Sequence, residues 1–185
     1  NFTIIVQLNP NDPVVASPDV TICQGDTTSL TATSSSPLVI SYSWTPTIGL
    51  SDPNSPNTLA FPPSTATYVV TTAYSDGCTS SDFVTVVVDD DPSLSISPKN
   101  INVCAGAILS VGATSNNIGM TFVWTELFTP FNTIPNTVTG ATSSASITAP
   151  VAPGTYQWNV EVTNLTGCST SELLTLTVGE VPVIP

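Results

Sequence analysis

The four cysteines are the residues of this chain whose chemistry is easiest to state. Cys23, Cys78, Cys104 and Cys168 stand far apart in a sequence of 185 residues that contains no His. A structural zinc site built from thiolates needs closely spaced pairs such as Cys-x2-Cys, and no such pair occurs in the sequence. Zinc binding is therefore not expected, and the role of the cysteines depends on the elements that surround them.

The charge composition excludes several other kinds of chemistry. The chain has 13 acidic residues, a single basic residue (Lys99) and a net charge of -12. Without His, a Ser-His-Asp or Cys-His triad lacks its base. Nucleic-acid binding needs a basic patch, an anionic membrane surface repels an acidic chain, and the sequence has no apolar run of about 20 residues. We expect no enzyme, no nucleic-acid binding and no membrane insertion.

Asp89, Asp90 and Asp91 form the one charge cluster that could hold an ion. Three consecutive carboxylates repel one another, and Ca²⁺ is a hard cation that takes oxygen ligands. The alternative is a solvated acidic linker. Calcium at these three residues is the only cofactor that the sequence suggests.

The surroundings of the cysteines are repeated along the chain. Residues 21–26 (TICQGD) correspond to 102–107 (NVCAGA), and 76–78 (DGC) correspond to 166–168 (TGC). Other landmarks recur in the same order, which indicates two copies of one module. The aromatic landmarks are Trp44 and Tyr68 in the first copy and Trp124 and Tyr156 in the second.

The repeat predicts the domain boundaries. The first module spans 13–90 and the second spans 91–179. Residues 1–12 have the form of the last strand of a preceding module or of a linker, and 180–185 lead toward a next module. The chain is therefore expected to be an internal piece of a longer protein.

The hydrophobic pattern within each module has a period of two, as in 156–162 (YQWNVEV). Strand signals recur about every 8–12 residues with turn signals between them, which favours a β-sandwich. The predicted fold is all-β, with two tandem immunoglobulin-like sandwiches. Trp44, Tyr68, Trp124 and Tyr156 are expected in their cores.

These landmarks resemble the PKD-like, immunoglobulin-fold repeats of very large surface and secreted proteins of Bacteroidetes. Many of those proteins belong to the type IX secretion and gliding-motility systems. The first copy carries the family pattern at 22–25 (ICQG), 42–46 (YSWTP), 49–53 (GLSDP), 67–71 (TYVVT) and 77–78 (GC). The second copy keeps both cysteines, the Trp and Thr155-Tyr156, but replaces the GLSDP stretch with Leu127 to Thr139.

The resemblance implies an extracellular or bacterial cell-surface protein whose modules form a structural or adhesive stalk. Its partners would be neighbouring homologous domains in the same chain, with surface polysaccharide or other cells beyond them. It also implies O-glycosylation of Thr27 within Asp26-Thr27-Thr28. Two alternatives stay open: a spacer or carbohydrate-binding module of a secreted hydrolase, and a filament subunit that donates the strand from Phe2 to Leu8 to a neighbour.

For an exported module of this kind, four cysteines in two equivalent pairs imply disulfides. The favoured pairing is within each module, Cys23–Cys78 and Cys104–Cys168, because each module carries its own pair. The alternative is Cys23–Cys168. In plain immunoglobulin topology the two cysteines of one module lie at opposite ends of the sandwich, and a bridge needs Cα atoms within about 7 Å.

Overall fold

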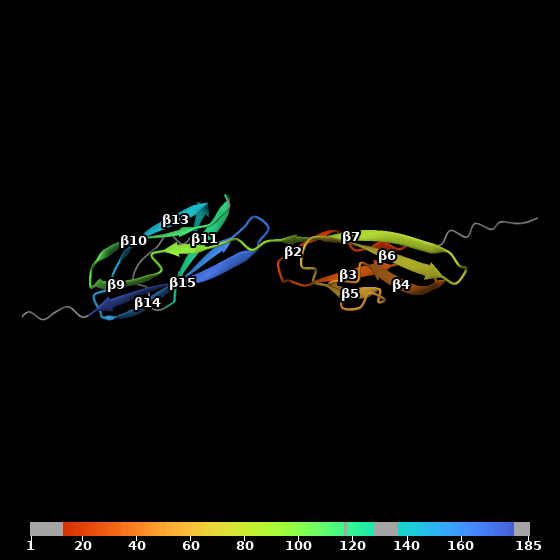
Figure 1. Cartoon of the computed structure of the whole chain (residues 1–185), viewed down its shortest axis with the longest axis horizontal. Helices are drawn as coiled ribbons and strands as arrows, with labels where there is room; N and C mark the ends of the chain where they lie inside the picture. Colours follow the sequence, from red (N-terminus) through yellow and green to blue (C-terminus); the bar gives the residue numbers. More distant parts are fainter. Residues whose placement is uncertain (1–12, 117, 128–136, 180–185) are drawn as a thin grey trace, which may run out of the picture. The chain divides into compact units, whose positions relative to one another are not determined.

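The computed structural model describes residues 13–116, 118–127 and 137–179. Within these ranges the regular structure consists of β-strands and contains no helix. The chain divides into two compact units, Asn1–Asp89 and Asp90–Pro185, coloured red to yellow-green and green to blue in Figure 1. This division falls one residue before the boundary expected after residue 90. The stretches 1–12 and 180–185, expected to belong to neighbouring modules, lie outside the described residues.

In its described part, the first unit is built from two sheets. One has the order β1-β3-β5 and the other β2-β7-β6-β4. Neighbouring strands are antiparallel, except that β2 runs parallel to β7. The strands are β1 (Val15–Ala16), β2 (Val20–Cys23), β3 (Thr28–Thr33), β4 (Val39–Thr45), β5 (Asn57–Ala60), β6 (Ala66–Tyr74) and β7 (Thr79–Asp89).

Alternation along the strands builds the core of the first unit. In β6, Tyr68 and Val70 are buried while Val69 between them is exposed, because successive side chains of a strand point to opposite faces. Leu30 from β3 and Trp44 from β4 pack in the same core, both fully buried. Each such side chain contributes about 1.5–3 kcal/mol of hydrophobic stabilisation.

In the first unit the polar atoms of Trp44 and Tyr68 have hydrogen-bond partners. Trp44 Nε1 donates to the carbonyl of Ser55 at 3.0 Å, and Tyr68 Oη donates to the carbonyl of Ile48 at 2.8 Å. Gly49 follows with φ +76°, and a Cβ at this position would lie 2.9 Å from Pro62 Cα. These bonds leave Trp44 and Tyr68 without an unsatisfied buried polar group, which would be costly.

The second unit has the same architecture with one additional strand among the described residues. Its sheets have the orders β13-β10-β8 and β12-β11-β14-β15-β9, and β9 runs parallel to β15. β12 lies beside β11, after the stretch 128–136, which lies outside the described residues. The strands are β8 (Ser95–Ser97), β9 (Asn100–Cys104), β10 (Ile108–Thr114), β11 (Met120–Glu126), β12 (Thr137–Gly140), β13 (Thr142–Thr148), β14 (Gly154–Thr163) and β15 (Ser169–Gly179).

The core of the second unit is again aromatic and aliphatic. Phe122 and Trp124 from β11, Trp158 from β14 and Leu174 from β15 are buried together. Trp124 Nε1 donates to Ser143 Oγ at 3.0 Å. The strand orders of the two units match, with β2 equivalent to β9, β6 to β14 and β7 to β15. The chain is therefore all-β and consists of two tandem immunoglobulin-like sandwiches.

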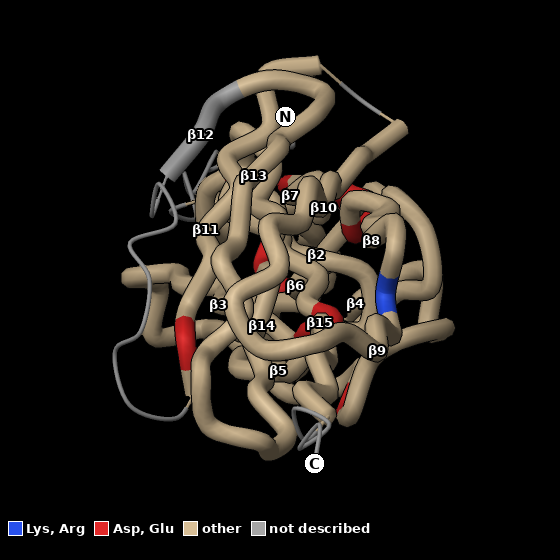
Figure 2. Tube along the Cα trace, turned by 90° about the vertical axis from the view of Figure 1, so that its left-hand side faces the viewer, with Lys and Arg blue, Asp and Glu red and all other residues tan. Residues whose placement is uncertain are grey.

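Acidic residues occur at several separate points of the chain trace, and the single basic residue is Lys99 (Figure 2). Lys99 Nζ lies 3.1 Å from a carboxylate oxygen of Glu172. Such an exposed ion pair contributes about 0–1 kcal/mol. None of the described residues forms a helix that could cross a membrane.

Candidate functional site

Cys23 lies at the end of the first unit where the chain leaves it, which we call the trailing end. It is the last residue of β2 and the strand partner of Asp89, the last residue of β7. The carbonyl of Asp89 accepts a hydrogen bond from Gln24 N at 3.0 Å. A turn at Gly25, with φ +88°, then leads the chain away from the sheet.

Cys78 lies at the opposite end of the same unit, where the chain enters, which we call the leading end. It directly precedes β7 in the hairpin that follows β6. Its backbone N donates to Asp76 Oδ1 at 3.0 Å, and its side chain is exposed. The same end holds the first described residues, because Val14 N donates to Ser80 Oγ at 3.1 Å.

The length of β7 separates the two cysteines of the first unit. Its 11 residues span about 35 Å at roughly 3.3 Å per residue, with Cys78 before its first residue and Cys23 beside its last. A disulfide needs Cα atoms within about 7 Å. The favoured pairing Cys23–Cys78 is therefore wrong, because it would require the sandwich to be broken.

The second unit repeats this arrangement. Cys104 ends β9 and is the strand partner of Gly179, the last residue of β15, while Cys168 directly precedes β15. Cys168 N donates to Asn164 Oδ1 at 2.8 Å, and Asn164 Nδ2 donates to the carbonyl of Asp90 at 3.4 Å. Cys104 is thus at the trailing end and Cys168 at the leading end, so the pairing Cys104–Cys168 is also wrong.

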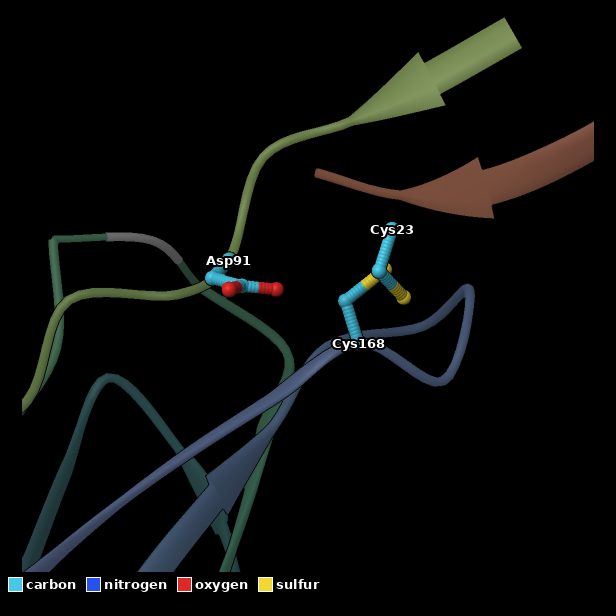
Figure 3. A group of neighbouring side chains, drawn as sticks. All are labelled: Cys23, Asp91 and Cys168. Carbon is cyan, nitrogen blue, oxygen red and sulfur yellow. The ribbon is translucent and has the colours of Figure 1, made fainter. Parts of the chain in front are cut away.

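The disulfide of this chain joins Cys23 to Cys168 (Figure 3). Cys78 and Cys104 are free thiols with exposed side chains. The alternative pairing is therefore the one found. Within the first unit Cys23 is the strand partner of Asp89. Within the second unit the hairpin before Cys168 is hydrogen-bonded to Asp90 through Asn164.

The surroundings of Cys78 favour the neutral form of its thiol. The negative charge of Asp76, desolvation and a side-chain hydrogen bond to Asp76 together raise the pKa of Cys78. The thiolate is the reactive form of cysteine, so this residue is less reactive at neutral pH than it would be without Asp76. The residue of the second module that is equivalent to Asp76 is Thr166, which carries no charge.

The predicted calcium cluster begins at the end of β7. A carboxylate oxygen of Asp91 lies within 4.8 Å of Cys168 Sγ (Figure 3), but a cystine sulfur is not the thiolate that metals require. Among the described residues, no converging group of three potential ligands contains Asp89 or Asp90. Calcium binding at Asp89, Asp90 and Asp91 stays a prediction.

The predicted core aromatic residues lie as follows. Trp44, Tyr68 and Trp124 are buried. Tyr156 is half-buried against the core of the second unit, and its Oη donates to the carbonyl of Ala152 at 2.9 Å. Trp158, which sequence reasoning did not single out, is also fully buried. The alternation of 156–162 was the signal that could have found it.

Thr27 is exposed in the turn after β2. O-glycosylation of Thr27 stays a prediction.

No family model matches this chain, and no curated protein matches it. Solved structures resemble it over most of its length. The chain is similar to immunoglobulin domains 1–4 of Sidekick-1, with 14% identity, 91% of this chain and 49% of that one covered, and a TM-score of 0.44. An ICAM-5 ectodomain fragment has 11% identity and a TM-score of 0.42, with 92% of this chain and 52% of that one covered. Domains 1–6 of the surface layer protein SbsC have 13% identity and a TM-score of 0.40, with 78% of this chain and 20% of that one covered. The chain thus spans about half, or less, of the length of these structures.

Proposed function

We propose that this chain is a load-bearing structural segment of a long extracellular bacterial protein. In this proposal the protein is a stalk that holds an adhesive or motility-driven tip away from the cell. We further propose that its modules are PKD-like repeats of the Bacteroidetes type, exported by type IX secretion and used in attachment or gliding. The observation that carries the load-bearing role is the disulfide between Cys23 and Cys168, one cysteine in each module.

This disulfide changes the path of tension along the chain. It closes a covalent loop that contains every residue from 24 to 167. When the two ends of the chain are pulled, force passes from Cys23 through the sulfur–sulfur bond to Cys168. The backbone inside the loop, which includes the strands from β3 to β14, cannot be extended while the bond holds. Resistance to extension then does not depend on the folding free energy of a domain, which is only about 5–15 kcal/mol.

The chemistry of the chain supports an extracellular location. Disulfides form and persist in oxidising surroundings outside the cytosol. The net charge of -12 limits nonspecific sticking to other surfaces and to anionic coats. In this setting the partners of the chain are homologous modules before and after it, and the stalk carries no catalytic group.

Single-molecule force extension tests the proposal. The protein is held by its first and last residues and pulled with and without a thiol-free phosphine reductant. The oxidised protein should not release the length of residues 24–167. The reduced protein should release several hundred ångströms more, since extended residues span about 3.3–3.6 Å each.

Two matched variants complete the test. Cys23→Ser combined with Cys168→Ser should behave as the reduced protein without any reductant. Cys78→Ser combined with Cys104→Ser removes the same number of cysteines but keeps the disulfide, so it should behave as the oxidised wild type. Equal extension of oxidised and reduced protein would refute the load-bearing role.

The two alternatives find less support. A polysaccharide-binding face would present a row of exposed aromatic side chains. Among the described residues only Phe61 and Phe83 are exposed aromatics. Phe61 follows β5 and Phe83 lies in β7, and these two strands belong to different sheets. Strand donation needs a vacant lane at a sheet edge. In the described residues β7 lies between β2 and β6, and β15 lies between β9 and β14, so these lanes are occupied by the chain itself.

A further inference from the structure

The two free thiols occupy the same structural positions as the two bonded cysteines. Cys104 is equivalent to Cys23: both end a strand that runs parallel to the last strand of their unit. Both are followed by a turn with a positive-φ glycine, at φ +88° for Gly25 and φ +75° for Gly106. The carbonyl of each cysteine accepts a short-range hydrogen bond from that turn, at 3.0 Å for Cys23 and 3.3 Å for Cys104.

Cys78 and Cys168 are equivalent in the same way. The carbonyl of Cys78 accepts a hydrogen bond from Tyr74 N at 3.0 Å, and the carbonyl of Cys168 accepts one from Asn164 N at 2.9 Å. A glycine precedes each cysteine, with φ +85° at Gly77 and φ +99° at Gly167. Each therefore presents its side chain from the same kind of hairpin at the leading end of its module.

Cys23, at a trailing end, is bonded to Cys168, at a leading end. The free thiols Cys104 and Cys78 occupy the same two kinds of position, so they could form a second disulfide of the same kind, which we call a joint. We propose that Cys104 forms a disulfide with the Cys78 position of another module of this type, supplied in the simplest case by a second copy of this chain. Cys78 in turn receives the trailing-end cysteine of a preceding module. The chain thus carries one formed disulfide, Cys23–Cys168, and two free cysteines that can each take part in a further one.

The reaction balances with a small disulfide as oxidant. The thiols of Cys104 and Cys78 react with one molecule of oxidised glutathione to give the protein disulfide and two molecules of reduced glutathione. The thiolate of one cysteine attacks glutathione disulfide and releases the first glutathione thiolate. The second cysteine then attacks the mixed disulfide and releases the other.

This inference extends the proposed stalk but does not need it. It rests on the proposed function only for its mechanical consequence: successive joints would carry tension through the segment from Cys78 to Cys104. The Cys104–Cys78 disulfide can form even if the force experiment refutes the load-bearing role. The load-bearing role can also be correct if this disulfide does not form. The two proposals are therefore tested separately.

The test uses two variants of the full chain. Cys78→Ser leaves Cys104 as the free thiol, and Cys104→Ser leaves Cys78. The variants are mixed in equal amounts, one of them isotope-labelled, and oxidised in a glutathione buffer. The joint predicts more mixed Cys104–Cys78 dimer than the two symmetric dimers together, and the wild type should form chains longer than two. Pepsin digestion and mass spectrometry identify the linked peptides.

A control variant separates recognition from mere exposure. Ile118 is 85% exposed and lies between β10 and β11, away from the trailing end. A triple variant with Cys78→Ser, Cys104→Ser and Ile118→Cys presents an exposed thiol there, and its mixture with Cys104→Ser should show no preference for the mixed dimer. A statistical mixture of dimers in the main experiment, or glutathione adducts alone, would overturn the proposal.

Discussion

Cys23 is the strand partner of Asp89 in the parallel pairing of β2 with β7. Because Asp89 is the last residue of the first unit, this cysteine stands where the chain passes to the next module. The following unit presents Cys168 in a hairpin that is hydrogen-bonded to Asp90 through Asn164. The position of each cysteine relative to the ends of the sheet, and not its membership in a module, thus decides which bond forms.

The thiol inventory of the native protein is the first prediction. In non-denaturing conditions without reductant, Cys78 and Cys104 should react with iodoacetamide, while Cys23 and Cys168 should not. After denaturation and reduction all four should react. Pepsin suits the digestion because the chain has a single Lys and no Arg. A peptide that links Cys23 to Cys78 would contradict the structure.

The second prediction concerns the carboxylate beside Cys78. Asp76→Asn keeps an oxygen for the backbone N of Cys78 but removes the charge that raises the pKa of the thiol. A lower pKa means more thiolate at a given pH below it, so reaction with a disulfide reagent at about pH 7.5 should become a few-fold faster. The rate is measured with Cys104→Ser present, so that Cys78 is the only accessible thiol.

The chain offers a matched control for this variant. Asp52 also accepts a backbone hydrogen bond from two residues later, Asn54 N at 2.9 Å, but it lies in the loop between β4 and β5 and not in the hairpin of Cys78. Asp52→Asn should leave the rate unchanged. Salt should reduce the difference made by Asp76→Asn, because exposed charges are screened. An unchanged rate in Asp76→Asn at low salt would show that the charge does not control the thiol.

The third prediction concerns the core of the first unit. Trp44 is fully buried with its Nε1 bonded to Ser55, so Trp44→Ala should cost roughly 3–5 kcal/mol of unfolding free energy. Phe83→Ala on the exposed face of β7 should change it by less than about 0.5 kcal/mol. Hydrogen exchange resolved by segment should show loss of protection in the first unit and little change around Trp124.

Sequence predicted the fold because the period-two pattern is a direct consequence of strand geometry. The same alternation places Tyr68 and Trp124 in the cores, where the structure has them. The disulfide was harder to predict, because a sequence gives spacing along the chain but no distance across a sheet. The length of β7, which separates Cys78 from Cys23, becomes visible only when the strands are paired. The additional strand β12 begins at Thr137, within the stretch Leu127 to Thr139 that replaces the GLSDP pattern of the first module, so the comparison of the two copies offered no template for it.

The last prediction concerns the close approach of Gly49 to Pro62 and Tyr68 in the first unit. Gly25 and Gly49 both have positive φ, but a Cβ on Gly25 would meet nothing within 4 Å, whereas one on Gly49 would lie 2.9 Å from Pro62 Cα and 3.0 Å from Tyr68 Oη. Both Ala variants carry the backbone cost of about 1–2 kcal/mol for a left-handed residue.

Gly49→Ala should cost about 1–3 kcal/mol more than Gly25→Ala, because overpacking adds to the backbone cost. It also disturbs the hydrogen bond from Tyr68 to Ile48. Denaturant midpoints at an unchanged slope of unfolding measure the difference. Equal midpoints for the two variants would mean that Pro62 and Tyr68 move aside freely, and that the turn at Gly49 does not constrain the core aromatic residue beside it.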